Sequence, residues 1–308
     1  RKKDASFHVM SNTQNNTAML KNYFKVAIRS LSKQKMFTVI NVLGLSAGMS
    51  IGILFITLIA FVQTYDNFHE NKQNIYRIIS NTDDKVKTKR LASSPAQLAQ
   101  LIQEEHAGFG EVVRINKSLQ AEAQFGNREI PLSGLFVESN FLNVFTFDLV
   151  AGDQSMDDPY GIYHGIYLTK SYANKLFSEQ NPLDEVIQLG ELGEFTVRGI
   201  LADLPKNSHM WFEALLPYTA LTKLTESGEM TANLDEWKNF RGNYTYLLLP
   251  EGSNPNILTN TLNEIAGVKY KDTDLFDASF RVQHMSDIAL GSDTSDELGT
   301  AWGTEIYL

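Results

Sequence analysis

Residues 37–62 read FTVINVLGLSAGMSIGILFITLIAFV and lie within 36–65, a run of thirty consecutive residues without a charge. A helix needs about 20 apolar residues to cross the hydrocarbon core of a bilayer. A cleavable signal peptide would have an apolar core of roughly 7–15 residues near the N-terminus, whereas this longer run begins only after 35 residues. We therefore expect residues 36–65 to form a retained transmembrane helix.

Charge is distributed very unevenly on the two sides of this run. Residues 1–65 carry eight bases and one acid, a net charge of +7, whereas residues 66–308 carry 19 bases and 35 acids, a net charge of −16. Basic segments that flank a transmembrane helix tend to stay in the cytoplasm. We therefore predict a cytoplasmic N-terminus and an extracytoplasmic domain of residues 66–308. The chain has no Cys, so this domain is expected to be stabilised by its core rather than by disulfides.

The basic residues before the span follow a helical pattern. Apolar side chains recur at helical spacing in residues 19–35, and cations repeat every four residues on another face. We predict an amphipathic helix in the membrane interface, where each cation near anionic head groups contributes on the order of 1 kcal/mol. The alternative is a continuation of the transmembrane helix with a solvated basic end. The predicted interfacial cations are Lys21, Lys25, Arg29, Lys33 and Lys35. Residues 1–18 are polar and Asn-rich, which predicts a disordered extension.

Three glycines in the span, Gly44, Gly48 and Gly52, form a GxxxGxxxG series. This spacing leaves one helix face without side chains, so another helix can approach closely. The alternative is that Gly is simply frequent in membrane helices. Residues 44–48 also match the GxSxG pattern of hydrolases, but that chemistry requires a strand, a strained turn and a helix, so a catalytic Ser46 is rejected.

Residues 66–308 predict a mixed α/β domain. A strand, a helix and a strand are expected near each end of this region, at 74–80, 95–106 and 112–116 and again at 244–249, 255–266 and 280–284. We infer an α+β fold in which 66–148 and 236–308 build one lobe and 149–235 form a second, inserted lobe. The insertion is expected to contain strands at 165–169, 185–190 and 194–201 and a helix at 170–177. Four phenylalanines at 136, 141, 145 and 147 predict core packing around a short helix.

Motifs for catalysis or cofactor binding are missing. The sequence contains neither a GxxxxGK[ST] nor a GxGxxG loop, so we expect no ATPase activity and no cofactor in this chain. The six histidines are far apart in the sequence and lack metal-ligand spacing, so no metal site is predicted. Glu104 and Glu105 are expected to be solvated. The acidity of residues 66–308 argues against nucleic-acid binding.

Five segments, through their order and spacing, resemble the membrane subunit of MacB/FtsX-type ABC transporters, especially the long permeases of Bacteroidetes. They are NYFKVAIRSLSKQKMFTVINVLGLSAG (22–48), YDNFHENKQNIYRII (65–79), VESNFLNVFTFDLVAGD (137–153), IYLTKSYANKLF (166–177) and FTVRGILADLPKNSH (195–209). Together they are spread over nearly all of residues 20–300. The resemblance implies a bacterial inner-membrane protein with a periplasmic "porter" lobe and an inserted "Sabre" lobe.

The resemblance also implies partners and a mechanism. A separate cytoplasmic ATPase would bind ATP and Mg²⁺, and a second permease copy would complete a dimer. Further transmembrane helices are expected after Leu308. A periplasmic or outer-membrane protein is a further expected partner. The movement of helices would drive the periplasmic lobes, by mechanotransmission, to export a peptide, lipid-linked or drug-like substrate. Two alternatives remain: an FtsX-like regulator of a cell-wall hydrolase or of envelope signalling, which transports nothing, and a single-span tethered periplasmic binding protein.

Overall fold

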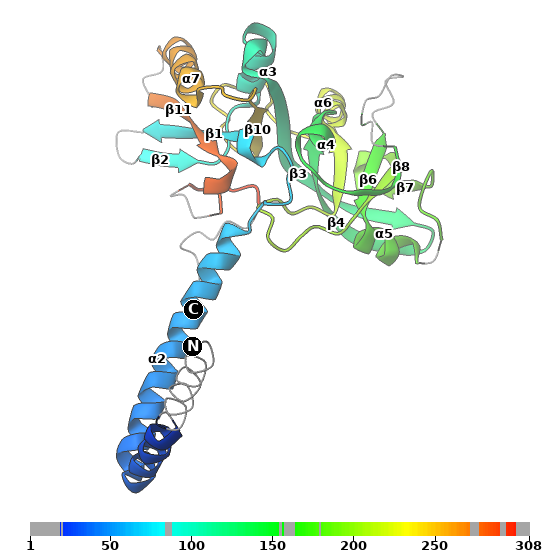
Figure 1. Ribbon diagram of the computed structural model, residues 1–308. Coiled ribbons are helices and arrows are strands. Elements are labelled where there is room, and N and C mark those ends of the chain that lie inside the picture. The colour runs from blue at the N-terminus through cyan, green and yellow to red at the C-terminus, as the bar shows by residue number, and fades with distance from the viewer. Residues whose placement is uncertain are drawn as a thin grey trace, which may run out of the picture. The chain divides into compact units, whose positions relative to one another are not determined.

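A computed structural model describes residues 19, 21–83, 88–153, 156, 164–178, 180–271, 277–289 and 294–299. The extension predicted at 1–18 lies outside the described residues. The chain forms two compact units, residues 1–60 and 61–308, and each is described by itself. As predicted, the fold is mixed α/β, with one apolar helix ahead of a sheet-rich domain (Figure 1). We call residues 61–308 the sheet domain.

The apolar helix α2 spans Lys35–Gln63 and contains the apolar stretch 37–62. It is long and apolar enough to cross a membrane, and the chain itself buries none of its residues. Residues 21–33 are also helical, and Gln34 lies outside both helical segments. The Thr38 hydroxyl donates to the carbonyl of Leu31 at 2.8 Å across this break. The interfacial position of residues 19–35 stays a prediction.

Eleven described strands of the sheet domain join in one sheet. The strands are β1 (Ile75–Asp83), β2 (Thr88–Leu91), β3 (Glu111–Phe125), β4 (Arg128–Val137), β5 (Leu149–Gly152), β6 (Gly165–Thr169), β7 (Val186–Leu189), β8 (Glu194–Leu201), β9 (Ala214–Pro217), β10 (Asn243–Leu248) and β11 (Asp277–His284). Their order is β11-β1-β10-β3-β4-β9-β6-β8-β5, with β2 beside β1 and β7 beside β3 and β8. Five described helices accompany the sheet: α3 (Ala96–Glu105), α4 (Phe141–Val144), α5 (Lys170–Phe177), α6 (Tyr218–Glu226) and α7 (Pro255–Lys269).

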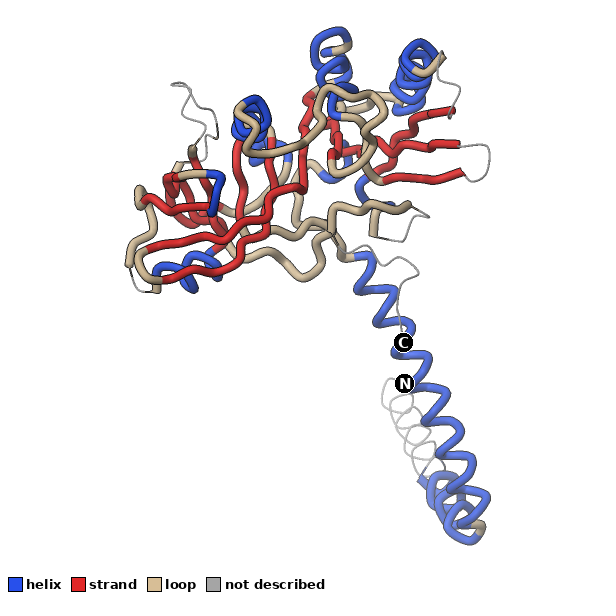
Figure 2. The backbone as a smooth tube through the Cα atoms, turned by 180° about the vertical axis from the view of Figure 1, so that it is seen from behind, coloured by secondary structure: helices blue, strands red, loops and turns tan. Residues whose placement is uncertain are grey.

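The strand–helix–strand units predicted at both ends are present, as β1–α3–β3 and β10–α7–β11, with β2 added to the first. The structure interleaves them, because β10 pairs antiparallel with both β1 and β3, and β11 pairs with β1. This is a split β-α-β arrangement. Helices α3 and α7 cover the same face of these strands (Figures 1 and 2) and pack on a core that includes Ile78, Leu247 and Phe280.

Between these pieces, α5 and β8 lie at the residues predicted for them, and β7 is shorter than predicted by two residues. Strands β4, β5 and β9 and helix α6 were not predicted from the sequence. Strand β9 reads ALLP and is buried throughout beside its parallel neighbour β4, and such a short apolar run has no diagnostic period. Because β3 and β4 continue one sheet into this region, the division into two lobes stays a prediction.

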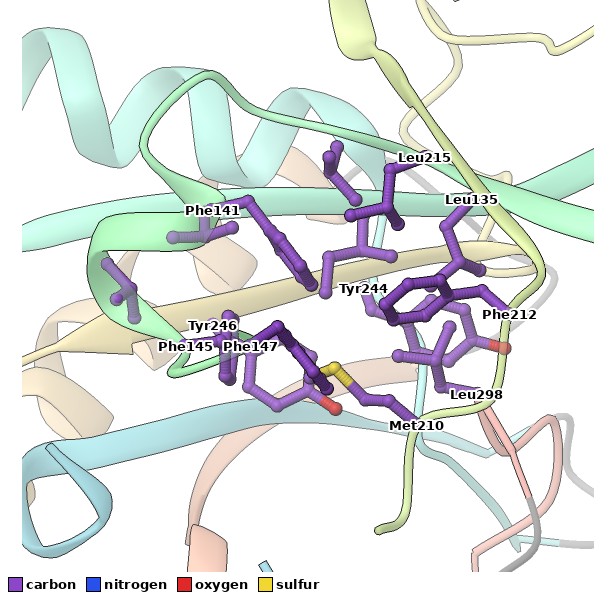
Figure 3. Close-up of a cluster of buried hydrophobic side chains, with 14 of the residues drawn as sticks. Leu135, Phe141, Phe145, Phe147, Met210, Phe212, Leu215, Tyr244, Tyr246 and Leu298 are labelled. Carbon is purple, nitrogen blue, oxygen red and sulfur yellow. The ribbon is translucent and has the colours of Figure 1, made fainter. Parts of the chain in front are cut away.

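The aromatic segment predicted as core packing is buried around the short helix α4. Phe136, Phe141 and Phe145 are fully buried, and Phe147 nearly so. In Figure 3, Phe141, Phe145 and Phe147 lie among Met210 and Phe212 from the chain before β9 and Tyr244 and Tyr246 from β10. The core thus brings together segments about 100 residues apart in the sequence.

Candidate functional site

The chain leaves α2 through a short segment, residues 64–72, that is bonded into the sheet domain. The Asp66 amide donates to the carbonyl of Asn207 at 2.8 Å, and the Asn207 side-chain amide donates to the carbonyl of Thr64 at 2.7 Å. The last carbonyls of a helix have no partner within the helix, so Asn207 supplies a missing donor. Asp66 has a φ of 55°, in the left-handed region often found just after a helix. These bonds fix the C-terminal end of α2 to the loop at 202–213.

Lys72 reinforces the same helix end. Its ammonium donates to the carbonyl of Tyr65 at 2.7 Å, and only 8% of the residue is exposed. Burial lowers the pKa of Lys72, although the nearby Asp66 carboxylate opposes this effect. A cation beside the C-terminal carbonyls of a helix interacts favourably with the helix dipole.

Asp66 is completely buried and lies against His209 from the loop at 202–213. Its Oδ1 accepts the His209 backbone N–H at 3.0 Å, and its Oδ2 lies 2.8 Å from His209 Nδ1. Burial alone would raise the pKa of Asp66, but the charge interaction and hydrogen bonds with His209 outweigh it and lower this pKa. The segment that follows α2 therefore carries a buried carboxylate that contacts His209.

His69 is the second buried histidine near this carboxylate. Its Nδ1 accepts the Thr146 amide at 3.0 Å, and its Nε2 lies 4.0 Å from Asp66 Oδ1. Burial lowers the pKa of His69 to about 3, with smaller contributions in the same direction from His209 and Lys72 and an opposing one from Asp66. The ring is therefore neutral at pH 7, and because Nδ1 accepts a bond, its proton lies on Nε2, toward Asp66.

From His209 the polar contacts continue into the core. His209 Nε2 lies 2.9 Å from the Tyr246 hydroxyl, which is also hydrogen-bonded to Arg77. Arg77 is a pure donor, so the Tyr246 hydroxyl accepts from it. Arg77 Nη1 lies 2.5 Å from Glu297 Oε2, and Nη2 lies 3.3 Å from Oε1, so the pair is bidentate. We call Asp66, His209, Tyr246, Arg77 and Glu297 the buried polar chain.

Arg77 is completely buried yet stays charged. Burial alone would lower its pKa, but Tyr246 and Glu297 outweigh burial and raise it, while burial raises the pKa of Tyr246. Strand register explains the grouping, since Arg77 pairs with Tyr246 on β10 and with Gln283 on β11. Three cross-strand neighbours thus form a row on the face opposite Ile78. Arg77 Nη2 donates to Gln283 Oε1 at 2.7 Å.

The buried polar chain ends on residues 294–299, the last that the structure describes. Asp296 in this segment accepts bonds from Ser93 at 2.7 Å, Lys117 at 2.5 Å and the Gly242 amide at 3.0 Å. Burial opposes ionisation of Asp296, but these donors outweigh it and lower the pKa. Leu298 is buried in the aromatic core (Figure 3). The exit of α2 and residues 294–299 are therefore bonded to the same part of the sheet.

This site was not predicted from the sequence. The six histidines are far apart in the sequence, whereas the structure brings His69 and His209 to one carboxylate. The only available signal was indirect: Asp66 and His69 lie in the segment 65–79 and His209 in 195–209, two of the segments that carried the resemblance. Within the described residues, no group of three or more His, Asp or Glu is arranged to hold a metal ion.

The residues singled out from sequence lie elsewhere. Lys21, Lys25, Arg29 and Lys33 are exposed on the helical residues 21–33, and Lys35 is the first residue of α2. Gly44, Gly48 and Gly52 share one face of α2, where an added Cβ would meet nothing within 4 Å. Ser46 lies in the middle of α2 and donates to the carbonyl of Leu43, so residues 44–48 do not form the strand–turn–helix of a hydrolase. The roles of these glycines and cations stay predictions.

The His69→Asn variant should be less sensitive to acid than the wild type. Since the folded pKa is about 3 and the ordinary value 6.5, the unfolded chain binds a proton that the folded chain excludes, and stability falls as pH drops from about 6.5 toward 3. Between pH 7.5 and 5 this costs about 2 kcal/mol. Asn retains an acceptor for the Thr146 amide but does not titrate.

Urea unfolding of the full-length protein in detergent, followed by tryptophan fluorescence at both pH values, measures the effect. The wild type should lose about 2 kcal/mol more than His69→Asn on acidification. Equal losses would show that His69 does not titrate as the structure implies.

The chain matches known proteins in sequence and in fold. Residues 38–265 match the sequence profile of the MacB-like periplasmic core domain. Among solved structures, a permease domain from Porphyromonas gingivalis is 20% identical, with a TM-score of 0.58 over 70% of this chain and 91% of that one. The periplasmic region of MacB from Actinobacillus actinomycetemcomitans is 15% identical, with a TM-score of 0.50 over the same shares. A search among curated proteins found no match.

Proposed function

The chain belongs to the family of proteins with a MacB-like periplasmic core domain, and on this premise we propose that it is a permease subunit of a MacB/FtsX-type ABC transporter. In this proposal a separate cytoplasmic ATPase hydrolyses ATP, and the membrane subunit converts the resulting helix movements into movements of the periplasmic sheet domain. The exported substrate would be a peptide, a lipid-linked molecule or a drug-like compound. No substrate has to cross the bilayer through a pore in this mechanism.

Charge and hydropathy support the placement in the membrane. In the proposed topology α2 crosses the bacterial inner membrane, with +7 on the N-terminal side and −16 on the other. Residues 19–35 then lie among the head groups of the cytoplasmic leaflet, where Lys21, Lys25, Arg29, Lys33 and Lys35 contact anionic lipids. The sheet domain lies in the periplasm.

The observation that carries the mechanism is the buried polar chain. Asp66 at the outer end of α2 contacts His209, and Arg77 within the sheet contacts Glu297, with Tyr246 between them. Separating a buried charged pair leaves a charge in the protein interior without a partner, which costs several kcal/mol. Such contacts therefore resist separation. A displacement of the end of α2 would therefore also move the sheet, which a flexible linker between them would not do. This is the property that mechanotransmission requires.

The open face of Gly44, Gly48 and Gly52 supports a partner helix, from a second copy of the protein or from further transmembrane helices. ATP and Mg²⁺ belong to the ATPase partner in this proposal. We propose export rather than FtsX-like regulation because of the size of the periplasmic domain. The family resemblance implies that division-type members have a smaller one. An FtsX-like regulator of a cell-wall hydrolase and a tethered binding protein remain the competing functions.

Spin labelling tests the proposal directly, because residues 1–308 contain no cysteine that would compete for the label. Ser253 is exposed in the turn before α7 and accepts a Ser253→Cys label. In the full-length complex with its ATPase in nanodiscs, we expect the label-to-label distance between two copies to shift when ATP is trapped. An ATPase without its phosphate-loop lysine should give no shift.

The alternatives predict different results. Distance distributions that ignore ATP would exclude energy coupling and leave the tethered binding protein. The regulator would be favoured by a different pair of results. The label distance would shift with ATP, but a strain that lacks the gene would lose cell-wall hydrolase activity without retaining an excess of any candidate substrate. A shift together with substrate retention in the deletion strain is the result expected for the exporter.

A further inference from the structure

The loop at 202–213 connects β8 to β9 and is hydrogen-bonded to the segment that follows α2. The apolar residues of α2 end at Val62, and Asn207 in the loop bonds to Thr64, two residues later. Asn207 therefore lies beside the chain just after the apolar residues of α2 end. If α2 crosses a bilayer, as the proposed function requires, this is the level of the lipid head groups.

The same loop presents a large aromatic side chain to the surface. Trp211 is 56% exposed, although its neighbours Met210 and Phe212 are each 1% exposed. Figure 3 shows Met210 and Phe212 within the aromatic core. Since side chains alternate in an extended segment, the two buried anchors hold the Trp211 indole on the outer surface. Tryptophan is enriched at membrane interfaces because its ring is apolar and its N–H is polar.

Two cations accompany this indole around a surface depression of about 340 Å³. Lys206 comes from the loop and Lys175 from α5, both are exposed, and neither forms an ion pair with another described residue. The two acids that line the same depression already have partners. Asp203 accepts from the amide and hydroxyl of Ser171 at 2.7 Å each, and Glu213 accepts the Ser133 amide at 3.0 Å. The ammonium groups are therefore available to an anion from outside.

We propose that Trp211, Lys206 and Lys175 form a membrane-contact surface that binds the phosphate head groups of the leaflet into which α2 emerges. The indole lies between head groups and acyl chains, and the two ammonium groups pair with lipid phosphates, each cation contributing on the order of 1 kcal/mol on an anionic surface. Through this contact the sheet domain would have a second point of attachment to the membrane, in addition to α2. It rests on the part of the proposed function that places α2 across the bilayer.

Lipid-borne quenchers test this contact in the full-length protein. Because residues 1–308 contain no cysteine, Trp211→Cys can be labelled with an environment-sensitive fluorophore in nanodiscs that contain phosphatidylglycerol and brominated phosphatidylcholine. Ile257→Cys on α7 is the matched control, because Ile257 is 58% exposed. We expect bromine near the head group to quench the label at 211 several-fold more strongly than the label at 257. Aqueous iodide should show the reverse order.

A Phe55→Cys label in the middle of α2 tests separately whether α2 crosses the bilayer, which is the premise of the membrane-contact surface. Quenching at 55 by bromine deep in the acyl chains, without lipid quenching at 211, would overturn the membrane-contact surface and leave α2 across the bilayer. The absence of lipid quenching at both positions would overturn both. A label at 211 shielded from lipid bromine and from iodide alike would also overturn the inference, since another protein would then cover the loop. Lys206→Glu with Lys175→Glu should weaken the quenching at 211 without changing that at 55.

Discussion

Replacing Arg77 with Met should destabilise the sheet domain by about 3–5 kcal/mol, because Glu297 would be left as a buried charge without its partner. The Arg77 side chain is fully shielded from solvent and that of Glu297 is only 16% exposed, so water cannot replace the lost contact well. Tyr246 and Gln283 would also lose a donor. For a domain of this size the melting temperature should fall on the order of 10 °C, measured on the full-length protein in detergent.

Two further variants make this prediction specific. Arg281→Met removes the same charge from an exposed position on the neighbouring strand β11 and should change stability by less than about 0.5 kcal/mol. Arg77→Met combined with Glu297→Leu removes both charges and should recover much of the loss, because no unpaired charge remains. Equal melting temperatures for Arg77→Met and Arg281→Met would show that the buried polar chain does not hold residues 294–299 on the sheet.

Gly48→Leu should reduce coupled ATP hydrolysis and assembly about tenfold. Gly48 is the middle residue of the open glycine face, and a Leu side chain there would keep a partner helix at a distance. Losing more than about 1.4 kcal/mol of packing free energy corresponds to a tenfold weaker association. The readouts are the amount of ATPase that co-purifies with the full-length protein and the hydrolysis rate of that complex.

Ser50→Leu is the matched control for the glycine face. Ser50 lies on the opposite side of α2, since two residues advance a helix by about 200°. Its hydroxyl bonds only to the carbonyl of Ser46 within the helix, so no contact with another element is lost. Near-normal assembly of Ser50→Leu with impaired Gly48→Leu is the expected pattern. Normal assembly of Gly48→Leu would refute the packing role of the glycines.

The sequence determined the features that depend on local pattern. The uncharged run at 36–65, the charge imbalance and the periodic segments that became α3, α5 and α7 are properties of consecutive residues. The same holds for β8, whose alternation and bounding turns are local. The family resemblance rested on segments of this kind and was confirmed by the match over residues 38–265.

Contacts between residues far apart in the sequence depend on the three-dimensional fold. Arg77 lies beside Tyr246 and Gln283 because of strand register, and a shift of one residue would turn Arg77 to the other face of the sheet. Asp66 and His209 are 143 residues apart and meet only because the loop at 202–213 folds back onto the end of α2. The hydrophobic periodicity of the sequence does not predict such a contact, since the contact depends on the path of the whole chain between the two residues.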